Sequence, residues 1–256
     1  MKKTVILSLF LLHLFLAEGQ LPDAAQIMEK TRDLTLTGSM QATVSLTITE
    51  KNGSTRNRTI SITTKSYDKG QEKRLIRFIE PADVRGTAML IVDNQNSADE
   101  MWIYLPALKK VRRIVSSEKG KSFMSSEFTN ADISSPPVSD FTYRHLEKSG
   151  TNNMWIIEST PTDDDIADDY GYSRKISYIS MDKTQPLKME FYNFDNVLFK
   201  TIEIKRILPL AEGKFLIKDM LATNLSNSRK SEILFSKINE GMKIDDSFFS
   251  VQKLEQ

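Results

Sequence analysis

The chain has 256 residues, of which 39% are hydrophobic and 27% are charged, a composition typical of a globular protein. It holds 35 Lys and Arg against 34 Asp and Glu, and 33 of each remain without residues 1–19. This balance argues against a nucleic-acid-binding protein, which needs a basic excess. There is no cysteine, so the fold depends on its core without disulfides and no lipobox cysteine anchors it to lipid.

Residues 1–19 have the organisation of a secretory signal peptide. Lys2 and Lys3 precede a 13-residue apolar run that is too short for a comfortable membrane span. Ala17 and Gly19 then form a small-x-small cleavage site. We expect cleavage before Gln20, a single domain over residues 20–256, and a location in the bacterial periplasm. The alternative is an uncleaved N-terminal anchor.

The first element expected after the signal is a helix over Leu21–Leu34. Pro22 suits a first helical turn, and the apolar side chains that follow recur at helical spacing. From Met40 to Ile48 the apolar residues alternate with polar ones, which predicts a strand with one apolar face. The Asn52-Gly53 pair predicts the hairpin turn that follows.

Short strands separated by turn residues continue to the end of the chain. They are expected over Thr55–Lys65, Arg74–Glu80, Thr87–Val92, Met101–Leu105, Val111–Val115, Asp140–Glu147, Met154–Thr160, Arg174–Met181, Leu187–Phe194, Val197–Ile207, Lys214–Ala222 and Arg229–Ile238. Arg74–Glu80 is apolar on both faces and should be covered on both. We expect a short helix over Glu127–Ser134 and an acidic loop over Asp163–Tyr172. The pattern predicts a mainly β protein, an incomplete antiparallel β-barrel, or half-barrel, with a few covering helices.

Catalytic and metal chemistry find little support in the sequence. His145 is the one histidine beyond the signal peptide, and with no cysteine this removes most nucleophilic triads and zinc sites. The five aspartates within Asp163–Tyr172 lack the spacing of a calcium-binding EF-hand and are better explained as a solvated loop. We therefore predict no metal, no cofactor and no enzymatic activity. A hydrolase whose carboxylates meet in the folded chain is the weakest of the alternatives.

The least ordinary part of the chain is Phe78–Asp132, which contains all candidate binding residues. Its basic run of Lys109, Lys110, Arg112 and Arg113 is either a charged edge strand that prevents aggregation or a rim that meets an anionic group. For the aromatic and soft side chains core packing is the first explanation, although apolar residues in a Gly/Ser-rich loop could plug or gate a cavity. The candidate ligand-binding residues of a cavity, rim or lid are Trp102, Tyr104, Arg112, Arg113, Phe123, Met124 and Phe128.

Three runs of this segment resemble a known family. They are F-x-x-P-x-D-x-x-G-T-A-x-L from Phe78, W-x-Y-L-P-A-L-K-K-V-R-R-I from Trp102, and S-F-M-x-S-E-F-x-N-x-D ending at Asp132. Together they resemble the outer membrane lipoprotein-sorting proteins, which are similar to the periplasmic lipoprotein carrier LolA and receptor LolB. The resemblance implies an incomplete barrel with an apolar cavity that holds acyl chains. It also implies an arginine that keeps a carrier closed, for which Arg74, Arg77 and Arg85 compete.

Two functions follow as expectations. The first is a monomeric periplasmic carrier that binds lipid or lipoprotein acyl chains, since each buried methylene contributes about 0.8 kcal/mol. The second is a non-enzymatic accessory protein that docks to an inner-membrane transporter through its basic rim.

Overall fold

The computed structural model describes residues 21–94, 97–147 and 149–256. The expected signal peptide over residues 1–19 lies outside these ranges. Within them, no helix combines the length and the apolar character that a membrane span requires.

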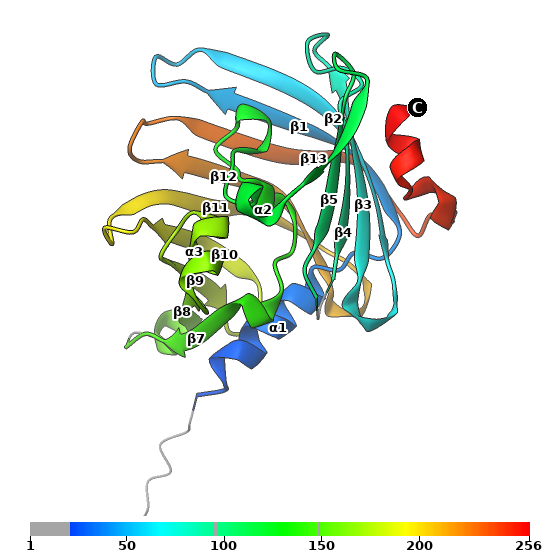
Figure 1. The fold of residues 1–256 in the computed structure, drawn as a ribbon. Coiled ribbons are helices and arrows are strands. Elements are labelled where there is room, and N and C mark those ends of the chain that lie inside the picture. The colour runs from blue at the N-terminus through cyan, green and yellow to red at the C-terminus, as the bar shows by residue number, and fades with distance from the viewer. Residues whose placement is uncertain (1–20, 95–96, 148) are drawn as a thin grey trace, which may run out of the picture.

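The described residues form one sheet of thirteen antiparallel strands, curved around a concave face but not closed (Figure 1). The expected fold class, an incomplete antiparallel β-barrel with a few helices, is confirmed. The strands are β1 (Met40–Thr49), β2 (Thr55–Ser66), β3 (Glu72–Glu80), β4 (Ala88–Asp93), β5 (Glu100–Leu105), β6 (Lys110–Ile114), β7 (Phe141–His145), β8 (Met154–Pro161), β9 (Arg174–Ser180), β10 (Pro186–Tyr192), β11 (Leu198–Pro209), β12 (Phe215–Asn224) and β13 (Lys230–Glu240). The α-helices are α1 (Ala24–Leu34), α2 (Asn130–Ile133) and α3 (Asp164–Tyr170).

The strand order places the first and the last strand of the chain side by side in the middle of the sheet. The order is β6-β5-β4-β3-β2-β1-β13-β12-β11-β10-β9-β8-β7, so β1 pairs with β13. The free edges are therefore β6 and β7, which follow one another in the sequence. Residues 115–140 connect these edges across the concave side, and we call them the strap.

The strap is anchored by its own aromatic side chains. Phe123 and Phe128 are 2% and 0% exposed and belong to the main core cluster with the inward side chains of β1, β2 and β3. The Phe123 ring lies 5.9 Å from that of Phe78, and the Phe123 amide donates to the Phe128 carbonyl at 2.7 Å. Burial of each aromatic side chain stabilises the strap by roughly 1.5–3 kcal/mol.

Helix α1 covers the β7–β9 end of the sheet. Asp23 caps its first turn by accepting from the Gln26 amide at 3.0 Å. Ala24 and Ile27 pack on the inward residues of β8 and β9. The helix begins three residues later than expected, at Ala24.

The C-terminal segment covers the outer face of the other half of the sheet. Phe249 and Leu254 pack against the outward side chains of β3 and β4. Leu75 of β3 is therefore buried on the outside while Ile76 is buried on the inside, as expected of a strand covered on both faces. Ile79, at the end of that strand, is 41% exposed and escapes this cover.

The expected acidic loop over Asp163–Tyr172 is wrong, because most of it forms α3. Asp163 caps the helix by accepting from the Ile166 amide at 2.9 Å. Asp164 and Asp165 lie in its first turn, where negative charge favours the helix, and Gly171 ends it with a φ of 75°. The first three aspartates therefore cap and begin a helix, while their side chains remain exposed to solvent as expected.

Helix α3 supports the strap through a close backbone approach. The Gly120 amide donates to the Asp169 carbonyl at 2.7 Å. A Cβ at position 120 would lie 2.7 Å from the Tyr170 carbonyl oxygen, and that backbone cannot move without displacing the helix.

We therefore expect Gly120→Ala to lower the free energy of unfolding by about 1–3 kcal/mol through overpacking. Urea unfolding monitored by circular dichroism measures this change. Ser117→Ala, at an exposed position of the same segment, is the matched control and should stay within about 0.5 kcal/mol of the wild type. Equal stability of the two variants would show that α3 and the strap are not in close contact.

Candidate functional site

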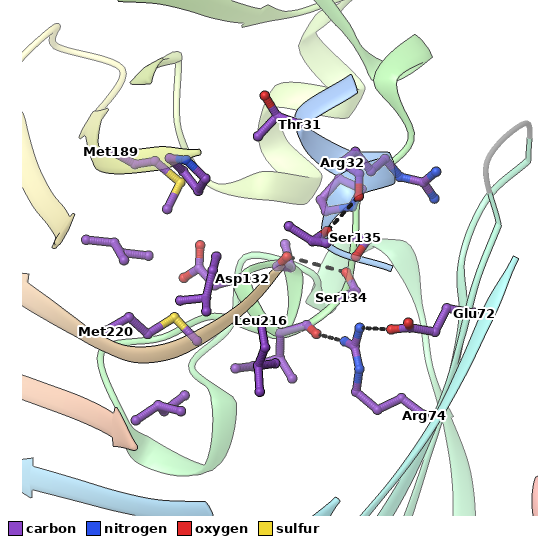
Figure 2. Close-up of a pocket in the computed structure, with 18 of the residues that line it drawn as sticks. Thr31, Arg32, Glu72, Arg74, Asp132, Ser134, Ser135, Met189, Leu216 and Met220 are labelled. Carbon is purple, nitrogen blue, oxygen red and sulfur yellow. Dashed lines mark hydrogen bonds and ion pairs between the residues drawn. The ribbon is translucent and has the colours of Figure 1, made fainter. Parts of the chain in front are cut away.

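A cavity of about 330 Å³ lies between the concave face of the sheet, α1 and the strap. Figure 2 shows Met189 and Met220 reaching into this space from the sheet, opposite the strap. Because cross-strand neighbours share a face, the inward positions of several strands combine into a mostly apolar wall. That wall includes Val44, Ile60, Ile62, Ile76, Met189, Phe191, Ile202, Met220 and Ile233, and the strap adds Phe123, Ala131 and Ile133.

A buried charge cluster stands where β3 meets the strap. Nη2 of Arg74 lies 2.5 Å from Oε1 of Glu72 and 3.3 Å from Oδ2 of Asp93. Nη1 of Arg74 donates to the Ile133 carbonyl of α2, and the Ser135 amide donates to Asp93 at 3.1 Å. Arg74 therefore joins the sheet to the strap at the cavity wall, as Figure 2 shows.

Burial and neighbouring charges shift the pKa values of the groups in this cluster. Burial opposes the charge of Arg74, but Asp93 and Glu72 together raise its pKa above the ordinary value. Burial raises the pKa of Asp93, although Arg74 acts in the opposite direction. Each group thus depends on its partners to remain ionised inside the protein.

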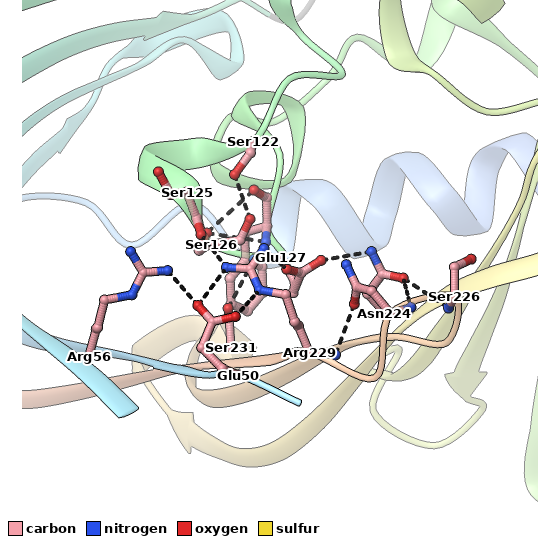
Figure 3. Close-up of polar contacts among 12 residues, drawn as sticks. Glu50, Arg56, Ser122, Ser125, Ser126, Glu127, Asn224, Ser226, Arg229 and Ser231 are labelled. Atoms are coloured by element: carbon pink, nitrogen blue, oxygen red, sulfur yellow. Dashed lines mark hydrogen bonds and ion pairs between the residues drawn. The ribbon is translucent and has the colours of Figure 1, made fainter. Parts of the chain in front are cut away.

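A second polar cluster holds the strap where it meets residues at or next to the ends of β1, β12 and β13 (Figure 3). Arg229 pairs with Glu127 of the strap at 2.7 Å and with Glu50 at 2.9 Å. It also donates to the Ser125 carbonyl at 3.0 Å. Asn224 donates to Glu127 at 2.9 Å, and the Glu127 amide donates to the Ser231 hydroxyl at the same distance. The strap is therefore fastened by charge-assisted hydrogen bonds on both sides.

Three further cations lie along the cavity or beside it. Lys200 pairs with Asp132 of the strap at 2.7 Å. Arg32 of α1 lines the cavity and is 9% exposed, and its guanidinium has no hydrogen-bond partner in the described part of the chain. Arg32 acts electrostatically on Asp93 and Asp99, lowering the pKa that burial raises in each. Lys175 of β9 also lines the cavity.

The strap residues predicted from sequence occupy three different environments. Phe123 lines the cavity, whereas Phe128 is fully buried behind it in the core. Met124 has a φ of 50° and lies with Arg112 at a separate shallow depression beside β6. Their role in binding a ligand stays a prediction, with Phe123 the best placed of them.

Trp102 and Tyr104 do not line the cavity. On β5 the inward residues are Met101 and Ile103, which belong to the main core cluster. Trp102 and Tyr104 alternate with these and pack under the C-terminal segment on the outer face. The prediction that Trp102 and Tyr104 line a cavity wall is therefore wrong, because both side chains pack in the outer cluster.

The basic run lies on the free edge strand β6 and in the turn before it. Lys109, Lys110, Arg112 and Arg113 are all exposed. Arg112 pairs with Glu118 at 2.7 Å, and Arg113 pairs with Glu100 at 3.3 Å while lying 5.9 Å from the centre of the Trp102 ring. Both explanations of this run, edge protection and docking rim, fit this position.

The sequence reasoning missed Arg32, Lys175 and Glu72. Glu72 lies before the expected start of its strand, and Lys175 lies between Arg174 and Ile176, so the sequence does not mark either side chain as facing inward. Only the pairing register reveals that the polar phase of β9 faces inward. His145, which is held by the Pro22 carbonyl at 2.8 Å and the Ser149 hydroxyl at 2.7 Å, has a structural role at the start of α1.

Several solved structures share this fold, and one of them carries a lipoprotein-sorting name. An outer membrane lipoprotein-sorting protein domain from Vibrio parahaemolyticus is 27% identical over 91% of this chain and 98% of its own, with a TM-score of 0.82. A DUF1329 family protein from Desulfovibrio piger is 25% identical over 90% and 97%, with a TM-score of 0.79. A LolA superfamily protein from Nitrosomonas europaea, at 17% identity over 90% and 99%, shares the fold with a TM-score of 0.70.

A family model described as "-like: Uncharacterized protein" matches residues 70–256, well over half of the chain. The chain belongs to the family of that model, and its fold is that of the outer membrane lipoprotein-sorting and LolA superfamily structures. No curated protein sequence matches it significantly. This LolA-like chain thus has the fold and the cavity that its sequence motif implied.

Among the residues that line the cavity, Arg74 is the one whose substitution is expected to lower the free energy of unfolding most. Arg74→Met leaves the carboxylates of Glu72 and Asp93 buried without their cation and should lower the free energy of unfolding by about 3–5 kcal/mol. Arg85→Met, at an exposed position, should change it by less than about 0.5 kcal/mol. Denaturant titration at neutral pH measures both. A loss below 1 kcal/mol in Arg74→Met would contradict the cluster described above.

Proposed function

We propose that this LolA-like protein is a periplasmic carrier that holds the acyl chains of a lipid or lipoprotein in its cavity, without covalent bonding. The observation that carries the proposal is the apolar cavity between the sheet, α1 and the strap. Its volume is at the lower end of the range of small-molecule sites, and burial of acyl methylenes there contributes about 0.8 kcal/mol each. The lipoprotein-sorting name of the Vibrio parahaemolyticus structure supports the same class of cargo.

The proposal involves no catalytic step. The carboxylates of Glu72 and Asp132 line the cavity, but each is engaged by a cation of the chain, Arg74 and Lys200 respectively. Their ion pairs help to hold the strap in place, and the cargo is released chemically unchanged.

Arg74 is the best candidate for the residue that keeps the carrier closed. It lines the cavity and bonds the Ile133 carbonyl of α2. By contrast, Arg77 donates to the Lys253 carbonyl in the C-terminal segment at 2.9 Å, and Arg85 donates to the Ile79 carbonyl at 3.1 Å. Among the described residues, Arg74 is the one of the three arginines that donates a hydrogen bond to the strap, and loss of that bond would free one side of the strap.

The basic run supports a second candidate function, docking to an inner-membrane transporter. Four exposed cations on a free sheet edge form a local positive surface on a chain of nearly neutral total charge. Reversing Arg112 and Arg113 to Glu should abolish capture of a transporter while leaving acyl-chain binding unchanged. Unchanged capture by the double variant would remove this candidate.

For the carrier function, a fluorescent acyl-chain probe should bind the wild-type protein in equimolar amount. Met189→Trp fills the cavity from the sheet side and should weaken binding at least tenfold, which corresponds to about 1.4 kcal/mol. Met242→Trp adds the same ring at a 38%-exposed position and is the matched control. Equal affinities in the two variants, or no binding by the wild type, would contradict the proposal.

A further inference from the structure

The half-buried side chain of Lys175 lines the apolar cavity, and its ammonium group has no hydrogen bond or ion pair in the described part of the chain. Its Nζ lies 5.4 Å from the centre of the Phe141 ring. A ring face attracts a cation but accepts none of the three N–H bonds that an ammonium can donate. A charge that faces an apolar cavity is costly unless an acceptor in that cavity forms hydrogen bonds with it.

The charges around Lys175 do not balance. The nearest carboxylate that acts on it is Asp132, which is engaged by Lys200 at 2.7 Å and by the Thr129 amide at 2.7 Å. Two lysines thus share one carboxylate, and one positive charge is left over at Lys175. Burial lowers the pKa of Lys175 to about 8, so the group still carries its charge for most of the time at neutral pH.

Two buried hydroxyls beside Lys175 also lack partners. Ser177 lies two residues along β9 on the same face, lines the cavity and is 3% exposed. Ser159 of β8 is the direct cross-strand neighbour of Lys175 and is 0% exposed. Neither hydroxyl has a hydrogen-bond partner among the described residues. Buried polar groups are normally satisfied, so hydroxyls of this kind beside a cation are candidates for hydrogen bonds to a ligand.

We propose that Lys175, with Ser177 beside it at the cavity wall and Ser159 behind them, forms the site for the anionic head group of an amphiphile whose acyl chain fills the rest of the cavity. This inference rests on the carrier function proposed above and specifies its cargo. A carboxylate or a phosphate supplies both the negative charge and the acceptor oxygens that the ammonium and the hydroxyls require. A neutral or cationic head group would leave the ammonium unpaired or repel it.

Chain-matched amphiphiles separate the contribution of the head group from that of the chain. Dodecanoate, dodecyl phosphate, dodecanol and dodecyltrimethylammonium are titrated into the full chain by calorimetry, below their micelle concentrations. We expect one or both anions to bind about ten to a hundred times more tightly than dodecanol, the range for a hydrogen-bonded charge. The stronger of the two anions identifies the source as a carboxylate or a phosphate.

Variants of Lys175 test the assignment. Lys175→Met should bind dodecanol as the wild type does and lose the preference for anions, whereas Lys175→Arg should keep it. Ser177→Ala should weaken anion binding severalfold with no effect on dodecanol, and it keeps the test valid if Lys175→Met does not fold. Lys183→Met, in the exposed turn between β9 and β10, is the control.

The outcomes distinguish this inference from the carrier proposal. If dodecanol and the anions bind equally, or if Lys175→Met keeps the preference for anions, the head-group site is overturned and the carrier proposal stands. If none of the four amphiphiles binds, both are overturned.

Discussion

The pairing of β1 with β13 is the contact on which the rest of the structure depends. It joins the first and last strands of the chain in the middle of the sheet, over a register from Met40 with Glu240 to Thr49 with Lys230. As a consequence, the free edges are β6 and β7, and the residues between them must cross the concave side. A curved sheet alone would leave an open apolar face in water, which is unfavourable. The strap and α1 cover that face, and the space that they leave is the cavity.

The strap combines two kinds of attachment with different consequences. Phe123 and Phe128 are buried in the core, which is a non-directional contribution that tolerates small movements. Arg74 on one side and Arg229 on the other hold it by hydrogen bonds to backbone carbonyls and by ion pairs. Removing such charges from water costs free energy, and their mutual attraction offsets this cost only when the geometry is good. These pairs favour one position of the strap.

Much of the fold follows from the sequence because alternation and turn residues are local. The strands from β1 onward lie within a few residues of their expected bounds, and the motif around Phe78, Trp102 and Phe123 indicated the family. The features that the sequence does not predict depend on contacts between residues far apart in the chain. Alternation does not tell which phase of a strand faces inward, so the sequence predicts Trp102 in a cavity wall although its side chain packs under the C-terminal segment. For the same reason the sequence does not single out Lys175, since the pairing with Ser159 and not the sequence of β9 identifies its face. The sequence predicts a loop for the aspartates before Tyr170 because their capping role depends on a helix of only seven residues.

The central claim is that the cavity holds the acyl chain of a lipid or lipoprotein. Native mass spectrometry of the protein, expressed from its full sequence and purified from the bacterial envelope without detergent, tests it most directly. The account predicts a stoichiometric adduct that releases a molecule with at least one acyl chain and that is reduced in Met189→Trp. An unliganded mass for the wild-type protein, together with no uptake of added acylated peptide or lipid, would contradict it.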